Sequence, residues 1–146
     1  AAFGTLHGIA GFTAIIFSAP LSSGALFRLG TFVVGIGGGW FSVGTLTAAM
    51  ALGQGGGAGI AVGAWGAVQA TVAGAGIVIG GALRDVLTSV ALAGDLGPGF
   101  MAPYVGYSFV YHLEVALLFG ALIAISPLVR WGRRKPATLG FAEMPG

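Results

Sequence analysis

Gln69 is the most conspicuous polar residue in a long apolar part of the sequence. The segment from Leu29 to Leu83 contains no Asp, Glu, Lys or Arg, and Gln69 lies near the middle of its last apolar stretch. An unpaired amide is costly inside a membrane, so a partner is expected for it. That partner is either a side chain on a neighbouring helix, in a hydrogen bond worth about 1 kcal/mol, or the carbonyl group of a ligand or pigment.

Four further polar residues have types and spacing that could carry chemistry. Arg84 and Asp85 end one apolar stretch, and Glu114 lies near the beginning of the next. We expect Arg84 to form a structural ion pair with Glu114 or Asp85, with a proton-handling or substrate-handling role as the alternative. His112 is a candidate axial ligand to the magnesium of a chlorin ring through a neutral imidazole nitrogen; the alternative is a hydrogen-bonded histidine at the membrane interface.

Catalytic motifs and a protein-held metal are not expected. The glycine-rich segment "GIGGGW" lacks the Lys-Ser/Thr ending of a phosphate loop, and "GAGIVIG" lacks the spacing of a dinucleotide fingerprint. The chain has no cysteine, and His7 and His112 are too far apart in sequence to indicate a metal pair. We therefore expect no catalytic residues, no enzymatic activity and no metal site of the protein's own.

The elements that position these residues follow from composition. The chain has 146 residues, of which 56% are hydrophobic and 7% are charged, whereas soluble domains carry about 25% charged residues. A membrane helix needs about 20 apolar residues. The sequence predicts an all-α integral membrane region over residues 1–131. Its four transmembrane helices are expected at about 1–19, 26–52, 60–83 and 107–131, followed by a tail at 132–146.

The basic residues predict the orientation of the chain. Arg130, Arg133, Arg134 and Lys135 cluster after the fourth span, and cytoplasmic flanks collect such residues. The expected topology has a cytoplasmic C-terminal tail, an extracytoplasmic loop at 85–106 and a location in the bacterial inner membrane. Because the basic residues belong to this flank, no nucleic-acid partner is expected.

Small residues in the third span predict close helix packing. A glycine weakens a soluble helix by about 1 kcal/mol relative to alanine, but in a membrane it allows a neighbouring helix to approach closely. The small residues recur at spacings of three and four, and we expect one face of the third span to pack against another helix. That face comprises Gly59, Gly63, Gly66, Ala70 and Gly74.

Two segments carry a resemblance to a known family. "GAWGAVQATVAGAGIVIGGALRD" (63–85) and "GYSFVYHLEVALLFGALIAISPLVR" (106–130) resemble the last two spans of the PucC/LhaA family. These are membrane proteins of phototrophic bacteria, similar to the major facilitator superfamily, with twelve expected spans. The chain resembles only the last third, spans nine to twelve.

The resemblance implies a role in assembling bacterial light-harvesting antenna complexes (LH1 or LH2), by handling bacteriochlorophyll or nascent antenna polypeptides. The implied partners are antenna polypeptides, the reaction centre and membrane lipids, and the implied cofactor is bacteriochlorophyll or a carotenoid. Flat aromatic rings pack well on such pigments. The candidate pigment or partner contacts are therefore Trp40, Phe41, Trp65, Gln69 and His112. Two alternatives stay open: a secondary transporter of the major facilitator superfamily, and a structural subunit of a photosynthetic complex.

Overall fold

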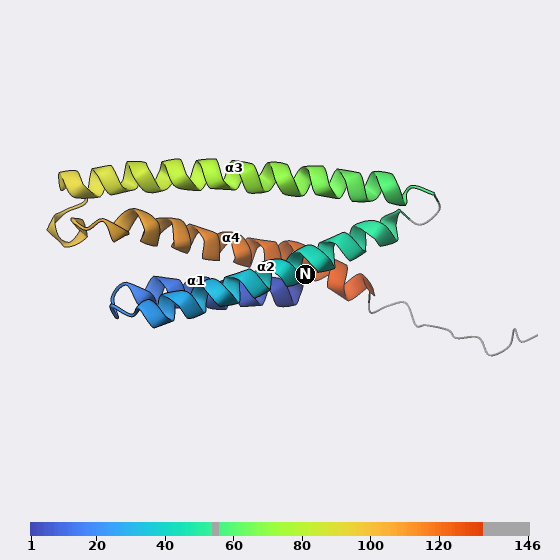
Figure 1. Ribbon diagram of the computed structural model, residues 1–146, viewed down its shortest axis with the longest axis horizontal. Helices are drawn as coiled ribbons and strands as arrows, with labels where there is room; N and C mark the ends of the chain where they lie inside the picture. The colour runs from blue at the N-terminus through green and yellow to red at the C-terminus, as the bar shows by residue number, and fades with distance from the viewer. Residues whose placement is uncertain (54–55, 133–146) are drawn as a thin grey trace, which may run out of the picture.

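The residues that the structure describes form four α-helices (Figure 1). The structure is a computed structural model that describes residues 1–53 and 56–132. The helices are α1 (Ala2–Ser18), α2 (Gly24–Leu52), α3 (Ala58–Ala93) and α4 (Tyr104–Gly132), with a short 3₁₀ turn, η1 (Pro98–Phe100), before α4. No strand occurs in the described residues. The predicted all-α fold is confirmed.

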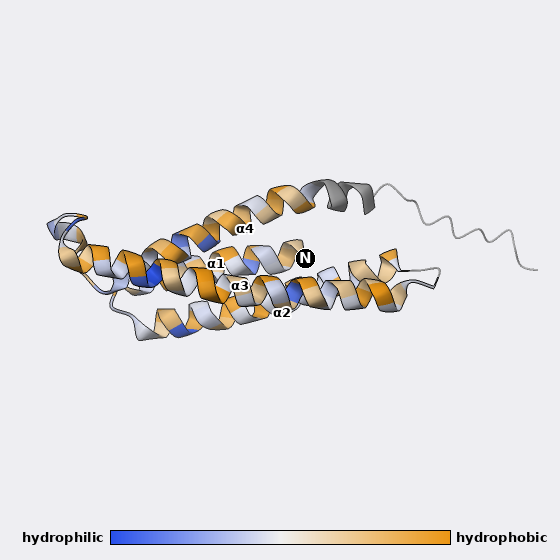
Figure 2. Cartoon of the chain, turned by 90° about the horizontal axis from the view of Figure 1, so that it is seen from above, coloured by the Kyte–Doolittle hydropathy of each residue, from blue (hydrophilic) through white to orange (hydrophobic). Residues whose placement is uncertain are grey.

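Three of the helices are long and apolar enough to cross a membrane. They are α2, α3 and the part of α4 from Tyr104 to Ser126. Helix α1 is also apolar but has only 17 residues. Hydrophobic residues cover these helices on most sides, and hydrophilic positions are scattered among them (Figure 2). The chain is a membrane protein. The tail at 133–146, on which the predicted orientation depends, lies outside the described residues.

The helices lie at the predicted spans, with starts that differ by two or three residues for α2, α3 and α4 and a larger difference at the end of α3. Helix α2 begins two residues early, because the hydroxyl of Ser23 accepts a hydrogen bond from the backbone N–H of Leu26 and caps the helix. Helix α3 continues through Arg84 and Asp85 to Ala93, so the prediction of a loop beginning at Asp85 was wrong. Nothing in residues 86–93 interrupts a helix. The first stop is Gly94, which adopts the left-handed backbone conformation (φ 88°) that ends many helices.

Helices α1 and α2 form an antiparallel pair, and α4 lies beside α1 (Figure 1). Helix α3 lies on the outside of this group, contacting α2 near its beginning and α4 near its end. The α1–α2 turn and the α3–α4 connection lie at one end of the molecule, and the α2–α3 hairpin lies at the other.

Glycines allow α1 and α2 to come into backbone contact. A Cβ atom on Gly37 would lie 2.7 Å from the carbonyl oxygen of Gly4 and 2.9 Å from the backbone nitrogen of Gly8. Farther along the pair, a Cβ atom on Gly30 would lie 2.7 Å from the carbonyl oxygen of Gly11. No larger residue fits at these crossing points, so the small-residue packing predicted for membrane helices occurs here.

The face predicted to pack on α3 has no neighbour among the described residues. A Cβ atom added at Gly59, Gly63, Gly66 or Gly74 would meet nothing within 4 Å, and Ala70 is exposed. The reason is the rotation of α3 about its axis, because the side chains that it turns toward α2 are those of Trp65 and Gln69 and their neighbours at the groove. Packing of this face against a helix outside the described residues stays a prediction.

Candidate functional site

A groove of about 470 Å³ lies between α2 and α3, near the hairpin that joins them. Three of the five residues predicted to contact pigment or partners, Phe41, Trp65 and Gln69, line this groove. The rest of the lining is small or aliphatic apart from one hydroxyl: Thr45, Ala49, Leu52, Ala61, Ala64 and Val68. The structure therefore brings an aromatic pair and an amide together on a mostly apolar surface.

Two hydrogen bonds cross between the helices at this groove. The indole Nε1 of Trp65 donates to the hydroxyl of Thr45 over 3.1 Å, and the amide Nε2 of Gln69 donates to the hydroxyl of Ser42 over 3.1 Å. Trp65 and Gln69 are four residues apart on α3, so they point from the same face. Gln69 thus has the interhelical partner that the sequence led us to expect, and its contact with a ligand stays a prediction.

The two hydroxyl partners, Ser42 and Thr45, are not among the residues predicted from the sequence. Ser42 and Thr45 lie three residues apart on α2, on one helix face, and this spacing was the available signal. The Thr45 hydroxyl also donates to the carbonyl oxygens of Phe41 and Ser42, at 3.0 and 3.1 Å. Because its proton is already committed to the backbone, Thr45 can only accept from Trp65. The arrangement holds the indole ring in one orientation beside the groove.

Trp40 lies apart from the groove, on a different face of α2. Its ring stacks with the imidazole of His7 on α1 (centroids 6.1 Å apart, planes at 17°) and meets the edge of Phe3. The Nδ1 atom of His7 is 2.8 Å from the carbonyl oxygen of Phe3. Sequence analysis treated His7 only as an isolated histidine, because nothing along the chain indicates that it meets Trp40.

His112 lies in a third place, on α4. Its Nδ1 atom is 2.7 Å from the carbonyl oxygen of Ser108, one turn earlier in the helix. This contact holds one ring nitrogen at the backbone, and ligating histidines use the same device to orient the other. His112 borders a cleft of about 280 Å³ with Phe100, Tyr104 and Phe109. The described residues contain no group of three metal-binding side chains, and the axial-ligand role stays a prediction.

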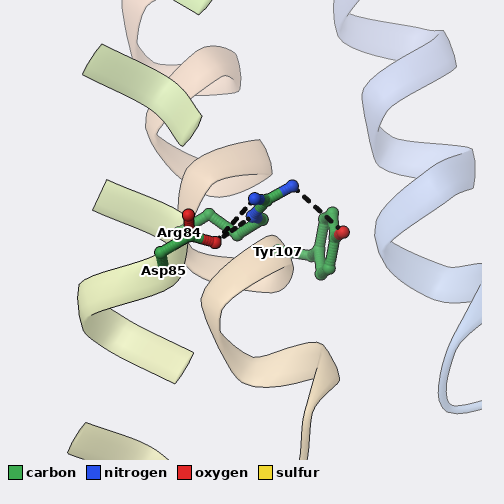
Figure 3. A network of polar contacts seen from close by, with 3 residues as sticks. All are labelled: Arg84, Asp85 and Tyr107. Atoms are coloured by element: carbon green, nitrogen blue, oxygen red, sulfur yellow. Dashed lines mark hydrogen bonds and ion pairs between the residues drawn. The ribbon is translucent and has the colours of Figure 1, made fainter. Parts of the chain in front are cut away.

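Arg84 is held by its own helix and by α4 (Figure 3). Its Nη2 and Nε atoms donate to Oδ1 of Asp85 over 2.6 and 2.8 Å, and Nη1 donates to the hydroxyl of Tyr107 over 3.2 Å. The guanidinium also lies over the Tyr107 ring, 5.1 Å from its centre. Sequence analysis did not include Tyr107 in this network.

The predicted pairing of Arg84 with Glu114 is not formed among the residues that the structure describes, where Asp85 is the ion-pair partner. The reason is the register of the two helices. Gly80 lies opposite Val110, and Arg84 lies opposite Gly106. Continuing this antiparallel register places Glu114 at the level of Gly76, about 12 Å along α3 from Arg84.

Comparison with known proteins finds relatives that match most of this chain. A relative from Rhodobacter capsulatus, described as an uncharacterized protein in the puhA-bchM intergenic region, is 46% identical over 152 aligned residues. These cover 99% of this chain and 32% of the relative. Protein PucC of Cereibacter sphaeroides is 48% identical over 127 residues, covering 87% of this chain and 27% of that protein. No solved structure matches the chain.

The chain thus spans about a third, or less, of the length of these curated relatives. Protein PucC of Rhodobacter capsulatus is 43% identical over 133 residues, which cover 90% of this chain and 28% of that protein. The family described as PUCC protein matches residues 1–132, which include all four helices. The chain belongs to the PucC family of membrane proteins.

Proposed function

We propose that the protein is an assembly factor for bacterial light-harvesting antenna complexes. In this role it handles bacteriochlorophyll or nascent antenna polypeptides within the membrane. Membership of the PucC family, whose resemblance implies this role, supports this class of function. The observation that carries the proposal is the α2–α3 groove with the unpartnered apolar surface beside it.

The groove has features that suit a flat, apolar molecule with a few polar atoms. Phe41 and Trp65 supply aromatic surface, and hydrogen bonds to Ser42 and Thr45 fix the side chains that flank it. Gln69 donates to Ser42 through its amide nitrogen, and its side-chain carbonyl oxygen accepts no hydrogen bond among the described residues. Binding sites of this kind are mostly apolar, with a small number of placed polar groups.

Beside the groove, the middle of α3 offers an apolar surface with the length of a membrane-helix contact. Residues 70–79 are all exposed, on every side of the helix, and they include Val72, Ile77, Val78 and Ile79, each more than 60% exposed. Small residues alternate with these aliphatic ones, as at helix–helix interfaces in membranes. An antenna polypeptide helix is a partner of matching chemistry for this surface.

His112 fits a second way of holding a pigment. Its Nδ1 atom faces the carbonyl oxygen of Ser108, which leaves Nε2 for the axial position of a chlorin magnesium. A pigment bound there would take His112 as the protein ligand of its magnesium. The residues beside it, Phe100 and Phe109, supply aromatic surface.

The test is deletion of the gene combined with purification of the tagged full-length protein. Antenna complexes should fall in the deletion strain while bacteriochlorophyll synthesis continues, and antenna polypeptides should co-purify with the tagged protein. A bacteriochlorophyll absorption band in the purified protein would assign pigment handling, and antenna polypeptides without pigment would assign polypeptide handling.

The same experiment separates the two alternatives. Normal antenna levels together with lost uptake of a solute would indicate a secondary transporter. A protein that stays in the mature complex at a fixed ratio to the antenna polypeptides, without affecting their assembly, would indicate a structural subunit.

A further inference from the structure

A second cavity, of about 350 Å³, lies at the end of the molecule opposite to the α2–α3 hairpin. It lies where the end of α1, the start of α2 and the start of α4 meet. None of the residues predicted from the sequence as pigment or partner contacts lines it. It is lined on one side by Ile15, Ser18, Ala19 and Phe27, and on the other, from α4, by Tyr104, Tyr107, Ser108 and Tyr111.

The tyrosines form an aromatic wall that continues to α1. Tyr107 and Tyr111 lie with ring centres 6.3 Å apart, and Tyr111 lies 5.8 Å from Phe12. The guanidinium of Arg84 covers the outer ring, that of Tyr107. Tyr107 is thereby held between a cation and a second aromatic ring, and the wall of the cavity is fixed in place.

The hydrogen bonds at the wall determine what kind of polar atom the cavity can bind. The hydroxyl oxygen of Tyr107 accepts a hydrogen bond from Nη1 of Arg84, so its own proton remains available to donate. No hydrogen bond among the described residues uses the hydroxyls of Tyr104 or Tyr111 as donors. On the opposite wall, the Ser18 hydroxyl donates to the carbonyl oxygen of Ile15 over 2.6 Å. The uncommitted protons come from the tyrosines and from Ser108 on the same helix, whose hydroxyl makes no hydrogen bond among the described residues.

A ligand for this cavity therefore needs hydrogen-bond acceptors on a flat, otherwise apolar ring. Its size also limits the ligand, because 350 Å³ is at the low end of the range for small-molecule sites, about 300–1,000 Å³. That volume suits a headgroup of one or two rings rather than a whole tetrapyrrole macrocycle. The surrounding surface is apolar, with Leu21 and Phe17 both more than half exposed nearby along α1 and its turn, and a long hydrocarbon tail can leave along it into lipid.

We propose that this cavity binds the headgroup of a membrane-soluble quinone, with the Tyr107 hydroxyl donating to one quinone carbonyl. A quinone provides two carbonyl acceptors on a flat ring and carries an apolar tail. Tyr111 supplies the ring against which the headgroup packs. Arg84 acts as a positioning residue, because it occupies the acceptor side of the Tyr107 oxygen and turns the proton toward the cavity. The proposal concerns a site separate from the α2–α3 groove.

The experiment is photoaffinity labelling of the full-length protein in lipid nanodiscs with an azido derivative of decylubiquinone. Adducts located by mass spectrometry should fall on the first two turns of α4 and the last turn of α1. Unlabelled decylubiquinone should compete, whereas decylbenzene, which has the tail but no carbonyl groups, should not.

Tyr107→Phe keeps the ring and removes the hydroxyl, which is both the proposed donor and the acceptor for Nη1 of Arg84. The half-saturating concentration of the photolabel should rise roughly three- to tenfold, as expected for one hydrogen bond. Thr47→Val, which removes an exposed hydroxyl of α2, should leave it unchanged. Ala19→Phe places a ring in the cavity and should abolish the labelling there.

Three outcomes would overturn the proposal. One is labelling that is spread over the lipid-facing helices and insensitive to Ala19→Phe. Another is equal competition by decylbenzene, which would show an apolar cavity without carbonyl recognition. The third is competition by bacteriochlorophyll and not by decylubiquinone, which would assign the cavity to a pigment.

Discussion

The α1–α2 pair and helix α3 are both rich in glycine, but only in the α1–α2 pair do the glycines bring two helix backbones into contact. At the α1–α2 crossing, glycine backbones touch, and a Cβ atom on Gly37 would lie 2.7 Å from the carbonyl oxygen of Gly4. On α3, Gly59, Gly63, Gly66 and Gly74 have nothing within 4 Å of where a Cβ atom would be. The small-residue surface of α1 and α2 is therefore closed by helix contact, whereas that of α3 is open, with no neighbour among the described residues.

This difference shows that a small-residue pattern identifies a surface that can be approached closely, without identifying what approaches it. Along α1 and α2, the partner is the adjacent helix in the chain, brought back by a short turn. Along α3, the neighbours diverge: α2 is bonded at Trp65 and Gln69, α4 contacts the helix from Gly80 onward, and residues 70–79 between these contacts are exposed. The open surface is therefore available to a partner, which is the basis of the proposed function.

The largest effect is expected from Gly37→Leu. The new side chain would displace the α1 backbone at Gly4 and Gly8, and overpacking of this kind costs about 1–3 kcal/mol or more of the free energy of unfolding. Thermal unfolding in detergent measures it. Gly38→Leu is the matched control, since nothing lies within 4 Å of that position. Equal stability of the two variants would contradict the glycine contact.

A smaller effect is expected from Gly106→Ala, where α4 meets α3. A Cβ atom there would clash with the carbonyl oxygen of Arg84 and the hydroxyl of Thr88, at a cost in the lower part of the overpacking range, about 1 kcal/mol. The cost is smaller than at Gly37 because alanine adds one methyl group at the contact, whereas leucine adds four carbon atoms. The measurement is unfolding in detergent, with Gly120→Ala on open α4 surface as the control. A Gly106 variant as stable as the Gly120 variant would show that α3 and α4 do not touch there.

A third measurement concerns the hydrogen bond between α2 and α3. In a double-mutant cycle of Gln69→Leu and Ser42→Ala, we expect a coupling energy of about 0.6 kcal/mol, the average for such bonds inside membrane proteins. Pairing Gln69→Leu with Thr47→Val instead should give none, because Thr47 bonds only to its own helix at Val43. Coupling to both hydroxyls would mean that the effect is not specific to the Gln69–Ser42 contact.

The smallest effect on stability is expected from Gly66→Leu. A helix packed on this face, as the sequence predicts, would make overpacking cost about 1–3 kcal/mol. With open space around the position, the change in unfolding free energy should instead stay within about 0.5 kcal/mol. In cells, the same variant should reduce co-purification of antenna polypeptides, because the larger side chain blocks the open face. A large loss of stability in the purified protein would mean that α3 already has a helix partner within the full-length chain.

The residues at the groove show where prediction from sequence stopped. Gln69 was recognised as needing a partner because an amide is costly in an apolar setting. Ser42 could not be assigned to it, since the pairing depends on how α2 and α3 turn about each other. The same holds for His7 and Trp40, which lie on different helices and meet only through the close α1–α2 crossing.

The ion pair of Arg84 shows the same limit, because the sequence did not decide which acid is its partner. The sequence established that Arg84 needs a partner and offered two acids, Asp85 and Glu114. The choice was made by the register of α3 against α4, which sets Tyr107 beside Arg84 and Glu114 about 12 Å farther along.

By itself, the sequence determined that the chain is a set of apolar helices, because a chain with 7% charged residues has too little polar surface for water and must satisfy its backbone hydrogen bonds internally. It also determined that α2 ends at Leu52, before a run of glycines. The tertiary structure alone decided which small-residue face is closed and which is open. That choice depends on the distances between helix axes, which are set by turns and crossing points far apart in the sequence, and no local pattern along one helix contains them.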